Sequence, residues 1–163
     1  MAISDYYGAE PDEISPFEDG PAVRGGTVAG FIATLLTSIA IVAVDISMLS
    51  DTIAGMYGFQ NALAIGLATH LVHGTVFGAI FALVLTDPSL AKVTNSLWKT
   101  ALAGVVYGLV LSLVATGFIM PVWVDFVGVS TIESMPYVTT SLVGWHALYG
   151  LVLGAMFPFL EKV

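Results

Sequence analysis

Cysteine is absent from this chain of 163 residues, and charged residues make up only 10% of it. Without a thiol, the chain cannot form a disulfide framework, ligate an iron–sulfur cluster through cysteine or use a thiolate nucleophile. The four basic residues are outnumbered by twelve acidic ones, which gives a net charge of −8. A protein that neutralises nucleic-acid phosphates needs clustered lysine and arginine, so this balance excludes nucleic acid as a partner.

Several sequence motifs of known enzyme classes are also missing. The chain contains neither GxxxxGK[ST] nor GxGxxG, and it lacks a GxSxG nucleophile elbow. Its lysines lie outside the long apolar runs, where none could form a buried Schiff base with retinal. These absences argue against a nucleotide-binding enzyme, a serine hydrolase and a retinal protein. We assign no catalytic residue.

Long apolar runs dominate what remains, with 57% hydrophobic residues and a mean hydropathy of +0.93. Four uncharged stretches each reach the roughly 20 residues that a helix needs to cross a bilayer: 25–44, 52–86, 100–124 and 134–160. Backbone groups find no water inside a bilayer, and the runs lack the alternation of barrel strands, so they predict helices. We expect an all-α membrane protein, a four-helix transmembrane bundle, with spans at about 25–47, 60–86, 99–121 and 137–160.

The few basic residues all lie on one side of these spans, at Arg24, Lys92, Lys99 and Lys162. The positive-inside rule therefore predicts a multi-pass protein of the cell membrane with both termini in the cytoplasm. The outer connections then hold only acidic charges, at Asp51, Asp125 and Glu133. Residues 1–22 contain six acids and no base, without the apolar core of a signal peptide, and predict an acidic cytoplasmic tail.

An internal repeat relates the two halves of the chain. Segment 70–81 (HLVHGTVFGAIF) and segment 146–157 (HALYGLVLGAMF) are identical at six of twelve positions. The preceding spans also align, GFIATLLTS at 30–38 with GVVYGLVLS at 104–112. We therefore expect two duplicated two-helix hairpins, entering the membrane the same way up and related by a pseudo-twofold axis along its normal.

Glycines recur at a spacing of four in every span. Such pairs let helix backbones approach closely, which matters in lipid because apolar surfaces gain nothing there by leaving water. We predict packing seams at Gly26, Gly30, Gly74, Gly78, Gly104, Gly108, Gly150 and Gly154.

Three histidines lie on the same helix faces as these glycines. His70 and His73 share a face of the second span with Gly74, and His146 and Tyr149 share the matching face of the fourth. Each repeat histidine lies roughly ten residues, or about 15 Å, from the end of its span and thus near the bilayer midplane. Ionisable residues at that depth usually face the bundle interior or a cavity, which makes them candidates for a functional site.

Three chemistries remain open for the histidines. A b-type haem could be ligated by His70 and His146, with His73 and Tyr149 nearby, although its propionates would find no basic residue in the outer connections. A zinc or copper ion could be held by His70, His73 and His146, although no deep carboxylate completes the set. Alternatively, the histidines hydrogen-bond to a carbonyl or to Thr69, Thr75 or Tyr149 and fix a scaffold.

Prolines and tryptophans in the second half of the chain predict its span ends. We expect Pro121 and Pro136 to act as stops at the ends of spans, and no span to be broken at its middle as transporter helices often are. Trp123 is predicted to anchor the membrane interface, and Trp145, beside His146, is predicted to pack in the bundle.

The acidic surplus, the length and the four-span pattern together resemble those of small four-helix integral membrane proteins of haloarchaea, some encoded near respiratory genes. The resemblance assigns no catalytic residues. Because a small multi-span protein without further chemistry is often a subunit of a larger membrane complex, we expect an accessory or electron-transfer subunit, in contact with lipid and with other membrane subunits or further copies of itself. A haem-binding membrane cytochrome and a small transporter or proton-relay protein are the alternatives.

The predicted orientation can be tested with single cysteines, since the chain has none of its own. Cysteine in place of Asp51 or Asp125 should react with an impermeant thiol reagent added to intact cells, because both positions precede or follow spans on the outer side. Cysteine in place of Lys92 should react only after lysis. The reverse pattern would contradict the orientation.

Overall fold

A computed structural model describes residues 20–128 and 135–161, and this part of the chain contains helices and no strand. Glu133, Lys162 and residues 1–19 of the predicted tail lie outside the described residues. The elements are α1 (Gly20–Val44), the π-helix η2 (Met48–Ile53), α2 (Leu63–Leu85), the 3₁₀ turn η3 (Pro88–Leu90), α3 (Ala91–Thr94), α4 (Leu97–Leu111), the π-helix η4 (Ser112–Ile119), α5 (Met120–Phe126) and α6 (Thr140–Leu160).

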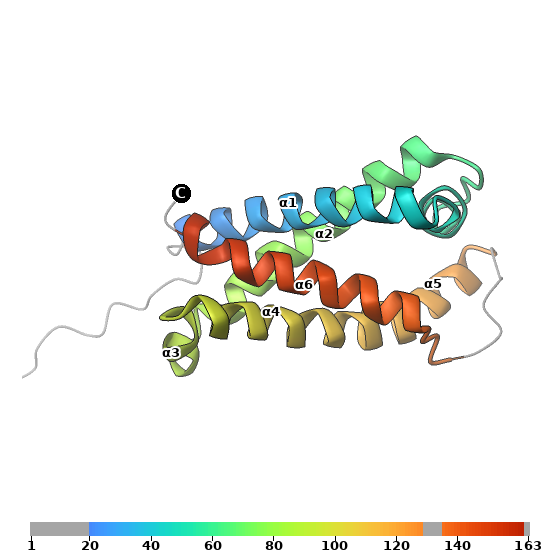
Figure 1. Ribbon diagram of the computed structural model, residues 1–163. Coiled ribbons are helices and arrows are strands. Elements are labelled where there is room, and N and C mark those ends of the chain that lie inside the picture. Colours follow the sequence, from blue (N-terminus) through green and yellow to red (C-terminus); the bar gives the residue numbers. More distant parts are fainter. Residues whose placement is uncertain (1–19, 129–134, 162–163) are drawn as a thin grey trace, which may run out of the picture.

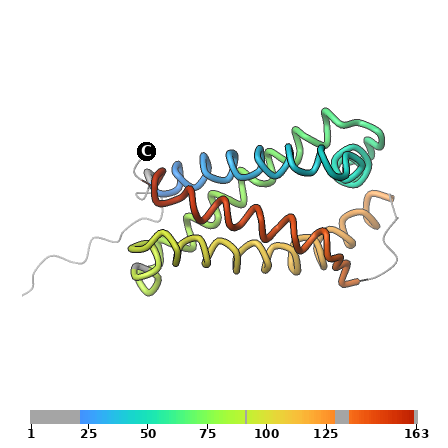
Figure 2. The backbone as a smooth tube through the Cα atoms, viewed as in Figure 1, coloured from blue at the N-terminus to red at the C-terminus, as the bar shows by residue number. Residues whose placement is uncertain are grey.

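Four of the helical stretches are long and apolar enough to cross a membrane: Ala22–Val44, Leu63–Leu85, Leu97–Phe126 and Thr140–Leu160. The chain traverses the bundle lengthwise four times (Figure 2). Segment 45–62 and α5 lie at one end of the bundle, and α3 lies at the other with the last turn of α6 (Figure 1). We call the former the α5 end. The all-helical, multi-pass architecture predicted from the apolar runs is confirmed.

The helix limits differ from the predicted spans in two places. Helix α1 begins at Gly20, so the last three residues of the predicted 1–22 tail belong to it. Pro21 is compatible with this start, because a proline in the first turn lacks an N–H that would have no partner there anyway. The third span continues to Phe126 and does not end at Pro121.

The π-helical segment η4 explains how Pro121 is accommodated inside the third span. A proline cannot donate to the carbonyl four residues before it and crowds that carbonyl. Here that carbonyl belongs to Gly117, and it accepts a hydrogen bond from the Tyr137 backbone N–H at 2.9 Å. The expectation that Pro121 is a stop was therefore wrong, whereas the third span, although π-helical over η4, continues as one helix and is not broken at its middle.

Helix α1 buries small residues and exposes large apolar ones. Ala29, Ala33, Thr34 and Ser38 of α1 are at most 2% exposed, whereas Ile39 of the same helix is 61% exposed. Water-soluble bundles show the opposite distribution, because they gain stability by hiding large apolar side chains. This arrangement suits lipid, where close packing of small residues replaces that gain.

Glycine contacts join the helices into two pairs. In the α1–α2 pair, Gly30 packs on Gly74 and Gly78; a Cβ at Gly30 would lie 2.8 Å from the Gly78 Cα. In the α4–α6 pair, Gly104 packs on Gly150 and Gly154 in the same way. A Cβ at any of the eight glycines predicted as seams would collide with the neighbouring helix.

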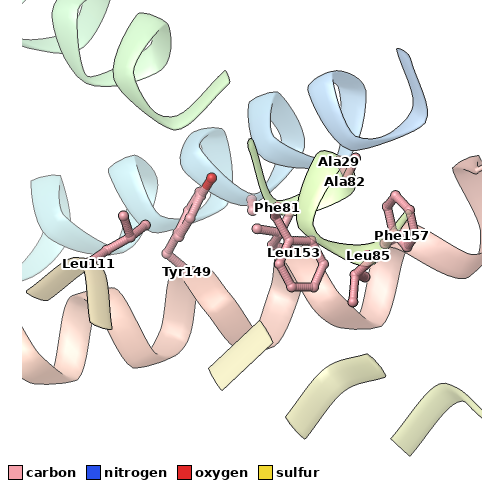
Figure 3. Packing of buried hydrophobic residues seen from close by; sticks show 9 residues of the cluster. Ala29, Phe81, Ala82, Leu85, Leu111, Tyr149, Leu153 and Phe157 are labelled. Carbon is pink, nitrogen blue, oxygen red and sulfur yellow. The ribbon is translucent and has the colours of Figure 1, made fainter. Parts of the chain in front are cut away.

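The two pairs meet through larger side chains. The α1 and α6 backbones pack against each other, and the phenyl ring of Phe81 on α2 meets that of Phe157 on α6 edge-on at 5.7 Å. Phe81 also lies 5.2 Å from the ring of Tyr107 on α4. Figure 3 shows this core as a row of side chains that ends, toward the α5 end, with Tyr149 and Leu111.

The glycine contacts predict that two glycine-to-alanine substitutions in α6 change the thermal stability differently. Gly150→Ala should markedly lower the thermal stability of the protein in detergent, because its Cβ would meet the Gly104 carbonyl oxygen and force the helices apart. Gly144→Ala should leave stability unchanged or raise it by up to about 1 kcal/mol, because nothing lies within 4 Å and alanine favours the helix. Equal melting temperatures for the two variants would contradict the role of the seam.

Candidate ligand-binding cavity

A cavity of about 410 Å³ lies between the two helix pairs, in the half of the bundle toward the α5 end. All four spans contribute to its wall, and the three histidines predicted as candidates, His70, His73 and His146, all line it. They are brought together because α2 and α6 both start at the α5 end and carry their histidines within the first three turns. The volume falls within the range of about 300–1,000 Å³ that is typical of small-molecule sites.

His70 is anchored from the neighbouring helix of its own pair. Its Nδ1 lies 2.9 Å from the Ser38 Oγ of α1. Nε2, on the other side of the ring, makes no hydrogen bond to a described residue. One edge of the imidazole is thus held in place and the other is available to a ligand.

His146 has both ring nitrogens engaged. Its Nδ1 donates to the Leu142 carbonyl one turn earlier, at 2.8 Å. Because a carbonyl can only accept, the ring hydrogen is on Nδ1, and Nε2 of the neutral ring accepts from the Thr116 hydroxyl at 3.1 Å. His146 is therefore a satisfied wall residue, fixed to the π-helical segment of the third span.

His73 pairs with a tyrosine of the connection between α1 and α2. The Tyr57 hydroxyl lies 2.7 Å from the His73 Nε2. The Tyr57 ring in turn packs 6.0 Å from the ring of Trp123, whose indole N–H donates to the Met56 carbonyl at 2.7 Å. These contacts close the α5 end of the cavity with aromatic side chains from both halves of the chain.

Tyr149 does not contact a histidine. Its hydroxyl donates to the Gly74 carbonyl at 2.6 Å and so bridges α6 and α2 beneath the cavity. The Tyr107 hydroxyl makes a second bridge between the pairs, to the Phe77 carbonyl at 2.8 Å. The expected histidine partners Thr69, Thr75 and Tyr149 were thus wrong. Thr75 donates to the Leu71 carbonyl of its own helix, because a threonine hydroxyl reaches that group without leaving its turn.

The repeat positions Ser38 and Ser112 have different surroundings. Both are 2% exposed, but Ser38 contacts His70, whereas the Ser112 hydroxyl, though buried, has no hydrogen-bond partner. His146, which occupies the repeat position of His70, bonds instead to Thr116, one turn further along. The two halves therefore present different donor sets to the cavity.

The residues do not assemble a metal site. Within 20–128 and 135–161, no three histidine, aspartate or glutamate side chains are close enough together to hold one ion. The three histidines predicted as a metal set all line the cavity, but they do not converge on one point. His73 bonds to Tyr57, and His146 bonds to Leu142 and Thr116.

A haem fits this cavity poorly. Ligation by two histidines requires a free nitrogen on each ring, and His146 has none unless it gives up Thr116 or Leu142. The wall also contains no lysine or arginine to pair with the propionates. Buried carboxylates without partners are costly, so the residues present do not suit this group.

Several wall residues carried no functional signal in the sequence. Tyr57 lies in a connection without periodicity, and Thr116 lies in the π-helical segment η4, which the sequence pattern does not indicate. Ser38, which does not line the cavity but bonds to His70, could have been found, since the aligned repeats 30–38 and 104–112 both end in serine. Trp123 and Trp145 line the cavity as well.

Comparison of the chain with protein families, with curated proteins and with solved structures finds no match.

The unequal serines predict unequal effects of one substitution. Ser38→Ala should lower the free energy of unfolding in detergent by about 0.6 kcal/mol, the average for an interhelical hydrogen bond in a membrane protein, because His70 loses its partner. Ser112→Ala should be neutral or stabilising, because it removes a buried hydroxyl that has no partner. Equal losses in the two variants would show that Ser112 has a partner after all.

Proposed function

We propose that this chain is a non-catalytic accessory subunit of a membrane complex, and that its task is to hold a neutral, lipid-soluble ligand in the histidine-lined cavity. One observation carries the proposal. Three histidines, rare polar residues in otherwise apolar spans, line a single cavity whose remaining wall is largely apolar and aromatic. Apolar pockets with a few placed polar groups are the usual form of a small-molecule site.

The charge of the wall supports a neutral ligand. Within residues 20–128 and 135–161, no aspartate, glutamate, lysine or arginine lines the cavity. Asp45 and Asp51 of the nearby connection are occupied elsewhere, accepting from Ser47 and from the Asn61 backbone N–H respectively. An ionic ligand would lose its hydration without gaining a counter-charge, which is costly in a low-dielectric interior.

The position of the cavity supports entry from the bilayer. Three of its wall residues at the α5 end are also surface residues, with Tyr57 and Trp123 each 42% exposed and Ile119 61% exposed. The cavity wall therefore extends to the outer surface of the bundle, and this surface is apolar like that of the rest of the spans. A molecule dissolved in lipid would reach the cavity without crossing water.

We also infer that the two helix pairs are copies of one ancestral hairpin. The support is that equivalent glycines pack in equivalent ways, Gly30 with Gly78 on one side and Gly104 with Gly154 on the other. Duplication followed by divergence accounts for a cavity between the copies whose two sides have different hydrogen-bonding groups, as the pair Ser38 and Ser112 illustrates.

A proton relay is the second candidate, favoured by the π-helical segment in the middle of the third span. Transporters often place irregular helix geometry beside their sites, and Thr116 of η4 contacts His146 directly. Proteoliposomes with an internal pH dye distinguish the two functions. A relay would collapse an imposed pH gradient and lose this activity in His146→Leu, whereas a ligand-holding subunit would not collapse it.

The proposed function predicts a bound small molecule. Protein purified from its own membrane in mild detergent should retain about one organic molecule per chain in native mass spectrometry. Ala115→Phe should weaken its binding, because Ala115 lines the cavity and a phenyl ring would occupy part of the space. Leu102→Phe is the matched control, since Leu102 is 53% exposed on the same span and does not line the cavity.

Three results would reject this function. One is the absence of any stoichiometric adduct, including after addition of decylbenzene as an apolar probe. Another is an adduct that persists unchanged in Ala115→Phe. The third is an optical spectrum of the reduced wild type with sharp α and β bands that disappear in both His70→Ala and His146→Ala but persist in His73→Ala, which would establish the haem alternative.

A further inference from the structure

The polar hydrogens of the three histidine pairs at the cavity can be counted from the hydrogen bonds. The pair His70 and Ser38 holds two polar hydrogens, one on the ring and one on the hydroxyl, and its mutual bond uses one of them. Ser38 does not line the cavity, so the hydrogen offered to a ligand is that of the His70 Nε2, which is free when the Ser38 hydroxyl donates to Nδ1. The pair His73 and Tyr57 likewise holds two and uses one. Each of these pairs therefore retains one hydrogen that it can donate.

The third pair retains none. The His146 ring hydrogen goes to the Leu142 carbonyl, and the Thr116 hydroxyl hydrogen goes to the His146 Nε2. Two other hydroxyls at the cavity, those of Thr34 and Thr37, donate to carbonyls of their own helix at 2.7 and 2.9 Å. Among these groups, the hydrogens that remain free to donate belong to the pairs of His70 and His73, the two histidines of α2, on one side of the cavity.

The two histidine pairs that retain a hydrogen favour a ligand that accepts hydrogen bonds at two places and carries no charge. Buried donors without acceptors are costly, so the two remaining hydrogens favour a molecule with two carbonyl-type oxygens. The wall also favours a ligand with a flat ring, because such a ring can stack on aromatic side chains or pack edge-on against them. The aromatic residues of the wall include Tyr57, Phe77, Trp123 and Trp145. The methionines Met48, Met56 and Met120 add polarizable contacts that adapt to ring substituents.

We propose that the cavity binds a quinone, a flat neutral ring with two carbonyl acceptors and an apolar tail, and that the His70 and His73 pairs donate to its carbonyl oxygens. The inference rests on the proposed ligand-holding function and names the chemical class of its ligand. The tail leaves the cavity where its wall reaches the lipid-facing surface, beside Ile119. Binding requires no electron transfer by this chain, and a partner subunit would supply any redox step.

The test measures how affinity depends on the number of carbonyls. Decyl-ubiquinone should quench the fluorescence of the cavity tryptophans Trp123 and Trp145 saturably in detergent, in a Trp98→Phe background that removes the exposed tryptophan of α4. Decanophenone, with one carbonyl, and decylbenzene, with none, compete for the same cavity. Each carbonyl should improve affinity roughly tenfold, as expected when a buried donor gains its acceptor.

Matched histidine variants identify the donors. His70→Leu removes the donor of its pair from the cavity wall and should reduce the preference for decyl-ubiquinone over decylbenzene about tenfold. His146→Leu, at a similarly half-buried wall position whose ring hydrogen already goes to the Leu142 carbonyl, removes no free donor and should reduce that preference less than His70→Leu does. His70→Gln keeps a donor and should restore part of the preference. A loss of protein stability would weaken the binding of both ligands, whereas a loss of carbonyl recognition would weaken only that of decyl-ubiquinone. Thermal unfolding measures the stability of each variant independently.

Two results would overturn the quinone inference alone. If decylbenzene competes as well as decyl-ubiquinone, the cavity holds an apolar molecule without recognising carbonyls, and only the broader function survives. If His146→Leu loses as much preference as His70→Leu, the count of free donors is wrong. If no probe binds saturably to the wild type, the ligand-holding function fails together with the inference.

Discussion

Backbone contact between glycines is the constraint on which the rest of this structure depends. In lipid, two apolar helices gain little by hiding side chains from the solvent, so they associate where their backbones fit closely. Gly30 with Gly78 and Gly104 with Gly154 provide that fit inside each helix pair. The two pairs meet through larger side chains, and the cavity forms in the half of the bundle where these leave space between the pairs.

The division of the bundle into a filled half and a hollow half follows from which side chains meet between the pairs. Toward α3, the rings of Phe81, Tyr107 and Phe157 fill the space. Toward the α5 end, the facing residues include Gly74 and Ala115, which are too small to meet across it. The bridge from Tyr149 to the Gly74 carbonyl marks the boundary. The histidines and the other polar groups on the α5 side of this boundary therefore border the cavity and do not pack against a core.

The third span shows how an irregular helix contributes to the cavity. Pro121 cannot bind the Gly117 carbonyl, and the chain responds with a π-helical segment and a bond from the Tyr137 backbone to that carbonyl. The wider turn places Thr116 against His146, where it occupies the ring nitrogen that a cofactor would otherwise use. A local adjustment of the backbone thus decides which histidines of the cavity remain able to donate.

Composition and periodicity alone determined the helical class, the four spans, the glycine positions and the choice of His70, His73 and His146 as candidates, because these depend on local properties such as hydropathy and residue spacing. The partners of those histidines depended on the tertiary structure. Tyr57 comes from a connection without pattern, and Thr116 is placed by a π-segment that hydropathy does not register. Sequence spacing indicates which face of a helix a residue occupies. Whether that face meets another side chain or a cavity depends on the volumes of residues far away in the chain, and only the packed bundle decides it.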